Sequence, residues 1–585
     1  MNDLTTPVGV PPVLLFSIGG DRVIARRRGS MACVSLDSFD ATVLRRLSGC
    51  MTIEQHMRRL CETLNAQPTR VALAIDRLLQ HGLVIPFLSN DVLPTVAPFN
   101  AAGTVAIVTS NRPKLLRRTL ISLATHFADC GVRPRVIVID GSQSQSASSV
   151  VASVQRSTGL SITYINYDNY LIIVNHLAAL GVPTRTMRYG TDLGNIGSNR
   201  NVALLMSAGA SLVMIDDDVI CDLWISPQRE DGMYIAGHAD LRNMETFASR
   251  TAALNGLSRT SVGLLQSHGA VLGRSLDSLL RDLAPVSLEH ACEHMLSAIE
   301  RPRDFRVRMT FAGLAGDSAV HCGHSVLFAT GRIRDELLTD DRVLATALGS
   351  REVRQIAPRV IVGHHAGCKS YCMGLDCAAL LPPFFSHGRN SDGVFGSLLA
   401  FCDPGALTAH LPIGVIHDST RTSHYLPAER LRYVRTTRLS EFIMSVVRAT
   451  AIRVDLPLTI ADRISILSES LREISKLPTD DFAELWADLA LRMRSIELQV
   501  LDRAVTSKCP SKAWSSALSD YRAALCRSAE GGALFVPHEF ADCGDSTEAF
   551  RAAQRTVGQF ADFMAVWPDM WRLMVEHPPT RLAPS

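Results

Sequence analysis

The chain has 585 residues, of which 47% are hydrophobic and 20% are charged. A chain of this length is expected to fold into three or four domains, and its composition argues against disorder over most of its length. Its 59 Lys and Arg residues against 57 Asp and Glu residues leave a formal charge of +2. This balance disfavours a protein that binds nucleic acid through its overall charge.

Neither a membrane-spanning segment nor a secretory signal is visible in the sequence. No run approaches the ~18–20 apolar residues that a membrane span requires. Residues 1–12 lack a basic region followed by an apolar core. The 14 cysteines are therefore expected to be mostly reduced thiols in a cytoplasmic protein.

Periodicity and composition divide the chain into four segments. Residues 1–86 are expected to form a small winged-helix-like module, and residues 87–103, which lack periodicity, a linker. Residues 104–427 alternate strands and helices, with residues 222–310 as a predicted insertion that contains helices. Residues 428–585 are predicted to be largely helical, because apolar residues recur there at helical spacing.

The first segment carries two strand-like runs and three helical patterns. The strand-like runs begin at Val13 and Cys33. A helical pattern follows the second run, Thr52 is a predicted N-cap for the next helix, and Pro68 precedes a third. Three short helices with flanking strands are the basis for predicting a winged-helix-like unit.

From residue 104 onward, short apolar runs alternate with helical segments. This alternation predicts βαβ units and an α/β fold with a mostly parallel sheet. Thr109, Asn111 and Arg112 follow the first predicted strand, Asp140 follows the second, and Asp216–Asp218 follow the fourth. Loops at the carboxyl ends of parallel strands bind ligands, so these residues are candidate contacts. The predicted strands are 105–108, 136–139, 160–165 and 212–215, and the predicted helices are 114–127 and 198–207.

The three adjacent aspartates at 216–218 are the most specific chemical feature. Neighbouring carboxylates repel one another, so a positive partner is expected beside them. Hard divalent cations prefer oxygen ligands, and a cation shared with a diphosphate needs only one or two protein carboxylates. The alternative interpretation is a helix that begins with acidic residues.

Four motifs together resemble a known family. In chain order they are TVAIVTSNRP, VIVIDGS, GNIGSNRNVALL and LVMIDDDV, and they resemble the nucleotide-binding half of GT-A glycosyltransferases of the family 2 type. The resemblance covers about residues 104–220, and LLPPFFSHGRNSDGVFG at 380–396 matches more loosely. It implies a GT-A-like, Rossmann-like core, a UDP- or GDP-sugar donor, and a bound Mn²⁺ or Mg²⁺.

The resemblance also assigns donor-binding residues. It implies that the nucleotide base and ribose lie near four residues of the first two loops, namely Thr109, Asn111, Arg112 and Asp140. Arg200 and Asn201 match the family's Arg-Asn pair behind the donor.

The DxD positions of the family correspond to Asp216 and Asp218. The resemblance implies that Asp218 is the direct metal ligand and that Asp216 lies nearer the ribose or a metal-bound water. Asp217, between them, is grouped with the donor-binding residues. His417 follows another apolar run and matches a late histidine that several GT-A enzymes use as a further metal ligand; a structural histidine is the alternative.

Asp392 is the predicted catalytic base. An acceptor hydroxyl needs a base during attack on the anomeric carbon, and the family has a Glu-Asp pair where this chain has Ser391-Asp392. With Asp392 as base, the reaction is a single displacement with inversion. The alternative is an Asp-Gly surface turn. Phe384 and Phe385 are either an apolar wall beside the acceptor or a buried pair.

A cluster of cysteines and histidines raises the question of a zinc site. Its spacing matches neither the paired Cys-x2-Cys form of zinc sites nor the usual cluster runs, so buried thiols and turn histidines are the preferred interpretation. The residues are His321, Cys322, His324, His364, His365, Cys368, Cys372 and Cys377.

The N-terminal segment has a resemblance of its own. FDATVLRRLSGCMTIEQHMRRL followed by VALAIDRLLQHGLVI resembles PqqD-like domains, which bind precursor peptides. In such domains a peptide adds a strand to the small sheet. This implies a peptide as acceptor, with a glycan as the other candidate; a packing module without a ligand is the alternative.

The sequence thus predicts a metal-dependent glycosyltransferase of hexosyltransferase-like, GT-A type. Two other classes compete with it. A nucleotidyltransferase of similar α/β design usually carries a Gly-rich, Arg- or Lys-containing segment after the first strand, which Thr109–Pro113 does not supply. The other is a non-catalytic DNA-binding protein that senses a sugar nucleotide, which the balanced charge disfavours.

Overall fold

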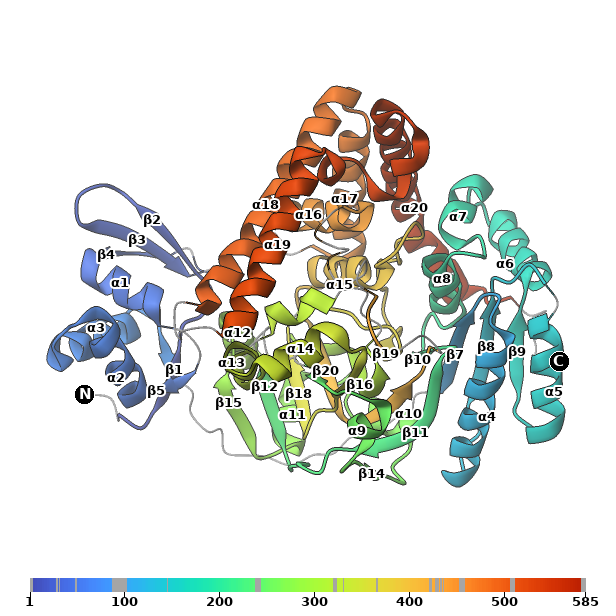
Figure 1. Ribbon diagram of the computed structural model, residues 1–585, viewed down its shortest axis with the longest axis horizontal. Coiled ribbons are helices and arrows are strands. Elements are labelled where there is room, and N and C mark those ends of the chain that lie inside the picture. Colours follow the sequence, from blue (N-terminus) through green and yellow to red (C-terminus); the bar gives the residue numbers. More distant parts are fainter. Residues whose placement is uncertain are drawn as a thin grey trace.

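The structure is a computed structural model with a small N-terminal module, an α/β part and a helical C-terminal part. Figure 1 shows the N-terminal module at one end of the molecule, the α/β part from the middle to the other end, and the helices from α16 (Leu439–Ala451) to α19 (Lys512–Glu530) above it. The predicted linker lies outside the described residues except for Gly103. The described residues are 4–27, 30, 32–47, 50–86, 103–144, 146–236, 244–318, 323–329, 331–364, 367–419, 423–426, 431, 434, 436–451, 458–505 and 511–579.

The N-terminal module contains the three predicted helices and two small three-stranded sheets. Thr52 caps the second helix as predicted, because its side chain accepts from the Gln55 amide at 3.2 Å while the Gln55 side chain accepts from the Thr52 amide at 2.9 Å. Buried Leu44, Leu60 and Ile75 share one core. The strands are β1 (Pro7–Gly9), β2 (Val13–Ser17), β3 (Arg22–Arg27), β4 (Cys33–Asp37), β5 (Met51–Thr52) and β6 (Ile85–Pro86), and the helices are α1 (Ser38–Arg46), α2 (Ile53–Leu64) and α3 (Pro68–Gln80).

Four parallel strands, in the order β10-β7-β8-β9, form the predicted βαβ part of the sheet. Helices cover both of its faces, and the register pairs Thr109 with Asp140 and Val108 with Asp216. The loops after these strands therefore meet at one edge. The elements are β7 (Thr104–Thr109), α4 (Pro113–Asp129), β8 (Arg135–Asp140), α5 (Ser146–Thr158), β9 (Ile162–Ile165), α6 (Tyr167–Ala179), α7 (Thr184–Thr191), α8 (Ile196–Met206) and β10 (Ser211–Asp216).

The sheet continues beyond β10 and becomes mixed, so the mostly parallel arrangement holds for one end of it. β19 (Cys372–Asp376) pairs antiparallel with both β10 and β16 (Arg306–Asp317), and β16 pairs parallel with β20 (Ala406–His417). Together with β11 (Val219–Ile225), the described strands make a 14-stranded sheet. The β11–β20 register sets Val219 opposite His417.

The predicted insertion at 222–310 contains helices, as expected, but it also contributes strands to the central sheet. β12 pairs parallel with β15 and with β18, which in turn pairs with β20. The elements of this part are β12 (Met233–Ala236), β13 (Glu245–Thr246), α9 (Arg250–Leu254), β14 (Ser258–Arg259), α10 (Leu264–Gly269), α11 (Leu276–Asp282), β15 (Val286–His290) and α12 (Glu293–Glu300). Those that follow are η2 (Gly323–Phe328), α13 (Gly331–Thr339), α14 (Asp341–Gly349), β17 (Glu352–Gln355), β18 (Val360–Gly363) and α15 (Ser391–Cys402).

The C-terminal part is helical, as predicted, and it shares a hydrophobic core with the α/β part. Buried Phe563 and Trp567 belong to the same cluster as Met214 of β10. The Trp567 indole donates to the Leu381 carbonyl at 2.6 Å. None of the described helices is both long enough and apolar enough to cross a bilayer. The elements are α16 (Leu439–Ala451), α17 (Ile460–Ser475), α18 (Thr479–Val505), α19 (Lys512–Glu530), η5 (Ala533–Phe535), η6 (His538–Cys543) and α20 (Ser546–Glu576).

Candidate active site

Asp217, the middle residue of the acidic trio, points into the protein. Its carboxylate accepts from the Thr109 hydroxyl and from the Arg112 guanidinium, both at 2.6 Å. The Thr119 hydroxyl lies 2.7 Å from the Asp217 carbonyl and fixes the backbone of the turn. Burial raises the pKa of Asp217 to about 7, although Arg112 and Thr109 act in the opposite direction. We therefore assign Thr109 and Asp217 to anchoring the acidic turn.

Asp218 lies between Arg112 and His417. Arg112 donates to its Oδ2 at 2.6 Å, and His417 Nε2 is 3.1 Å from its Oδ1. Burial acts to raise the pKa of Asp218, but His417 and Arg112 outweigh it and hold that pKa below its ordinary value. For His417, burial acts to lower the pKa, and Asp218 raises it. The structure thus brings together two residues that are 199 positions apart and were both predicted as metal ligands.

The tautomer of His417 bears on whether this pair fits a metal ion. His417 Nδ1 lies 2.8 Å from the Asp317 carbonyl oxygen, which can only accept, so Nδ1 carries a proton and donates it. In the neutral ring, the lone pair of Nε2 then faces the lone pairs of Asp218 Oδ1, and this contact is repulsive. A second proton on the ring, or a cation between the two atoms, makes it attractive. A histidine that donates its other N–H to a carbonyl is the usual form of a metal ligand.

The donor set fits Mn²⁺ better than Mg²⁺, because Mg²⁺ takes oxygen ligands and His417 offers nitrogen. Among the described residues, no group of three or more His, Cys, Asp or Glu side chains could hold a metal ion. Divalent ions in phosphate-transfer sites commonly take their remaining ligands from substrate phosphates and water. Asp218 and His417 therefore fit an ion that is held jointly with a ligand.

A buried arginine connects the acidic turn to the predicted base. Arg200, 3% exposed, donates to Asp216 Oδ1 at 3.1 Å and to the Ser370 hydroxyl at 2.5 Å. Ser370 in turn donates to Asp392 Oδ2 at 3.3 Å. Arg200 also donates to the Ser391 hydroxyl at 3.1 Å. The two carboxylates, 176 positions apart in the sequence, are thus connected through one guanidinium and one serine hydroxyl.

Asp392 lies in the first turn of α15, not in the surface Asp-Gly turn that was the alternative. Its Oδ1 accepts from the Gly393 amide at 3.0 Å, and its side chain is partly exposed. Asn390, just before the helix, adopts a left-handed conformation with φ of 69°. This turn presents Asp392 at the start of the helix, where the partial positive charge of the helix N-terminus stabilises a carboxylate.

The Asp140 carboxylate is fully engaged within the protein. Tyr164 donates to its Oδ2 at 2.6 Å, while the Ser142 amide and hydroxyl both donate to its Oδ1. The Ser142 hydroxyl also accepts from the Asn111 amide at 2.6 Å. Asp140 therefore shapes the loop at the sheet edge, and the exposed Asn111 is the residue of this corner that can reach a ligand.

Asn201, Phe384 and Phe385 are buried and make their contacts in the protein interior. The Asn201 amide donates to the Gly190 and Phe384 carbonyls and accepts from the Phe384 amide at 2.7 Å, so contact with a donor would break these bonds. These bonds tie α8 to Gly190 and Phe384, and the donor-binding role of Asn201 stays a prediction. Phe384 and Phe385 are 0% exposed; Phe384 stacks on Phe395, and Phe385 meets Phe560 edge to face. They are the buried pair, and the acceptor-wall interpretation is wrong.

The three described cysteines among the zinc candidates are buried. Cys368, Cys372 and Cys377 are free thiols, and burial raises the pKa of each. Cys368 lies 3.7 Å from the sulfur of Met373, and Cys372 lies 3.9 Å from His268 Nε2. Buried thiols of this kind pack as small apolar groups. The candidates His321, Cys322 and His365 lie outside the described residues.

Several residues of the site have no sequence motif. Ser370 connects Arg200 to Asp392. Arg118 of α4 donates to Asp418 Oδ2 at 2.6 Å and to its carbonyl at 2.5 Å, which ties α4 to the residue after His417. Asp317 holds the His417 ring through its backbone carbonyl. An Asp beside a candidate histidine was a signal that could have identified Asp418, whereas nothing in the sequence marks Ser370 or Arg118.

Comparisons with known proteins give little further information. No protein-family model matches the chain, and no curated protein matches it. Among solved structures, residues 1–349 of S. aureus TarS match with 14% identity and a TM-score of 0.24, over 73% of this chain and 91% of that chain. Because the identity and the TM-score are both low, we draw no conclusion about this chain from that similarity.

Proposed function

We propose that this protein is a metal-dependent glycosyltransferase that moves a sugar from a UDP- or GDP-sugar to an acceptor hydroxyl with inversion. The observation that carries this proposal is the buried connection from Asp216 through Arg200 and Ser370 to Asp392. It joins Asp216, the first carboxylate of the acidic trio, at one end to the partly exposed carboxylate of Asp392 at the other. Transfer between two bound substrates needs such a pair of neighbouring sites. The resemblance of residues 104–220 to GT-A enzymes of the family 2 type agrees with it.

The donor side of the site is the edge formed by the loops after β7, β8 and β10. In the proposal, the exposed Asn111 and the half-exposed Arg112 contact the nucleotide, while Thr109 and Asp140 support them from behind. Arg112 neutralises Asp217 and Asp218 in the absence of a ligand. Without this guanidinium, three adjacent carboxylates would repel both one another and a diphosphate.

Asp218 and His417 are the residues that would hold Mn²⁺, with Asp216 near the ribose. A bound ion supplies Lewis acidity that stabilises the charge on a departing diphosphate. The chain itself supplies the geometry: Asp317 and Arg112 fix the orientation of His417 and Asp218 respectively. This orientation is set before any ligand arrives, which reduces the cost of reorganisation during the reaction.

The proposed reaction is one displacement at the anomeric carbon. The acceptor oxygen forms a bond to that carbon, and the bond from the carbon to the β-phosphate oxygen breaks, leaving its electron pair on the nucleoside diphosphate. The acceptor proton passes to Asp392. Hydrogen bonds from Ser370 and the Gly393 amide hold the Asp392 carboxylate in one orientation. A single displacement inverts the anomeric configuration.

Isothermal titration calorimetry with a panel of UDP- and GDP-sugars, with and without Mn²⁺, tests the proposal. We expect at least one nucleotide sugar to bind, with a higher affinity in Mn²⁺. The Asp218→Asn variant should lose the Mn²⁺ effect, while Asp222→Asn, which removes a more exposed carboxylate paired with Arg259, should keep it. Absence of binding across the panel would refute the donor site. Release of pyrophosphate from UTP or GTP incubated with a sugar 1-phosphate would identify a nucleotidyltransferase instead.

A further inference from the structure

A large cavity begins beside Asp392 and is not explained by the donor site. Its volume is 1220 Å³. Val326, Phe328 and Ile333 on one wall belong to the hydrophobic cluster of η2, α13, α14 and α19. Met444 and Val447 of α16, on another wall, belong to the cluster that includes α15 and α20. The cavity therefore lies between two hydrophobic clusters that leave a space between them.

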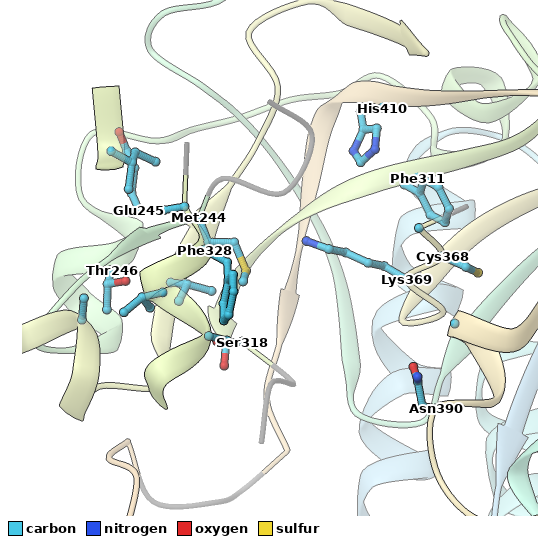
Figure 2. A pocket seen from close by; sticks show the side chains of 18 of the residues that line it. Met244, Glu245, Thr246, Phe311, Ser318, Phe328, Cys368, Lys369, Asn390 and His410 are labelled. Carbon is cyan, nitrogen blue, oxygen red and sulfur yellow. The ribbon is translucent and has the colours of Figure 1, made fainter. Parts of the chain in front are cut away.

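Polar and apolar residues line both sides of the cavity. Figure 2 shows Lys369, His410, Phe311 and Asn390 on one side, and Phe328 with Glu245 and Ser318 on the other. The side chains of Val326, Phe328, Ala329, Ile333 and Met444 are only partly buried, although all are apolar. Apolar surface left open inside a hollow of this size is characteristic of a ligand site.

The Lys369 side of the cavity includes residues next to the predicted base, Asp392, which is not itself part of the lining. Asn390 and Gly393 line the cavity and flank Asp392 in the sequence, and the Gly393 amide donates to the Asp392 carboxylate. Cys368, two residues before Ser370, lines it as well. A molecule in the cavity would thus have one end next to the carboxylate that Arg200 and Ser370 position.

We propose that this cavity binds the acceptor, and that the acceptor is a small molecule with a hydroxyl group on an extended apolar body. This inference rests on the proposed function. The hydroxyl would lie at the Asp392 end and the apolar body between η2, α13 and α16. The hydroxyl oxygen then takes the sugar, and its proton goes to Asp392.

The apolar part of the lining favours an apolar body over the two acceptors suggested by the sequence. Hydroxyl groups of a glycan, or N–H and C=O groups of a peptide, would lose their hydrogen-bond partners where they lie against Val326, Ile333 and Met444. Among the charged residues that also line the cavity, Arg354 already pairs with Glu245, and Glu497 with Arg494. An apolar body needs no new partner from them. The volume also exceeds the ~300–1,000 Å³ of typical small-molecule sites, which suits an extended ligand.

Binding of the neutral apolar fluorophore N-phenyl-1-naphthylamine tests the cavity apart from turnover. We expect saturable binding to the full-length protein. Ala400→Trp and Ala329→Trp, at two half-buried alanines of the lining, should each weaken binding by about tenfold or more, which corresponds to about 1.4 kcal/mol. Ala178→Trp, at a half-buried alanine of α6 that is absent from the lining, is the matched control and should leave binding unchanged. Thermal melting identifies any variant that fails to fold. If one cavity variant fails to fold, the effect on fluorophore binding is measured with the other.

Turnover with matched acceptors tests the chemical class. Octyl β-glucoside and methyl β-glucoside carry the same sugar hydroxyls and differ in the apolar tail. With the nucleotide sugar that binds most tightly in calorimetry, we expect at least about tenfold higher kcat/KM for the octyl compound, and Ala400→Trp should remove the difference. Three results would overturn this inference alone. They are an equal kcat/KM for the two compounds, a higher kcat/KM for the methyl compound, and no fluorophore binding while the donor still binds. Absence of donor binding would instead refute the proposed function, and the acceptor assignment with it.

Discussion

Replacing Arg200 by methionine tests the connection between the two halves of the site. The guanidinium donates to Asp216, Ser370 and Ser391, and its loss leaves the Asp216 carboxylate beside the protein interior without its partner. Breaking a buried ion pair costs about 3–5 kcal/mol. The Asp216 side chain is 20% exposed, so water offsets part of this cost and the lower end applies. The two serine hydrogen bonds add about 1 kcal/mol each, which gives about 5 kcal/mol in total.

Urea unfolding followed by circular dichroism measures this loss. The double variant Arg200→Met/Asp216→Asn removes the unpaired charge and should recover about 2–3 kcal/mol relative to Arg200→Met alone. Arg492→Met removes an exposed arginine that pairs with Asp488 on α18 and should cost less than about 1 kcal/mol. A loss below about 1 kcal/mol for Arg200→Met, or a double variant no more stable than the single one, would refute this account of the ion pair.

Three further predictions concern catalysis and acid stability. Asp218→Asn, or excess EDTA with the wild type, should reduce transfer by at least about 10²–10³-fold with an unchanged circular dichroism spectrum, and full activity in EDTA would contradict the metal role. Asp392→Asn should lower kcat by about 10²–10⁴-fold with donor affinity retained in calorimetry, and near-normal turnover would exclude it as the base. Burial lowers the pKa of His56, which is 0% exposed, to about 4, below the ~6.5 of the unfolded chain. The unfolded state then binds more protons as pH falls from about 6.5 to 4, so the folded state should lose about 3 kcal/mol over that range. Calorimetric melting of wild type and His56→Gln at pH 7 and pH 5 measures this, and equal shifts in the two proteins would disprove it.

Much of the local structure follows from the sequence, because it depends on interactions within a few residues. The strands β7, β8 and β10 were predicted from short apolar runs, and Thr52 was predicted as a cap from its position before a helical pattern. The acidic trio was placed correctly at the end of β10. By contrast, the contribution of β12 and β15 to the central sheet had no local signal, since strand pairing depends on residues far apart in the chain.

The roles of the site residues likewise depend partly on local sequence and partly on the tertiary structure. The three adjacent carboxylates at 216–218 suggested metal chemistry, and the resemblance to GT-A enzymes suggested nucleotide binding at 109–112 and a base at 392. Which side chains face a ligand depends on their partners: Asp140 and Asn201 are fully hydrogen-bonded inside the protein, whereas Asn111 is exposed. Ser370 has no motif, because its function here is to accept from one distant residue and donate to another.

The sequence by itself therefore determined which residues could take part in the chemistry and which segments are strands or helices, because side-chain chemistry and periodicity are local properties. The tertiary structure alone decided that Asp218 meets His417, that Arg200 stands between Asp216 and Asp392, and that two hydrophobic cores leave a cavity between them. Those features come from long-range packing, in which the position of each side chain depends on the whole fold.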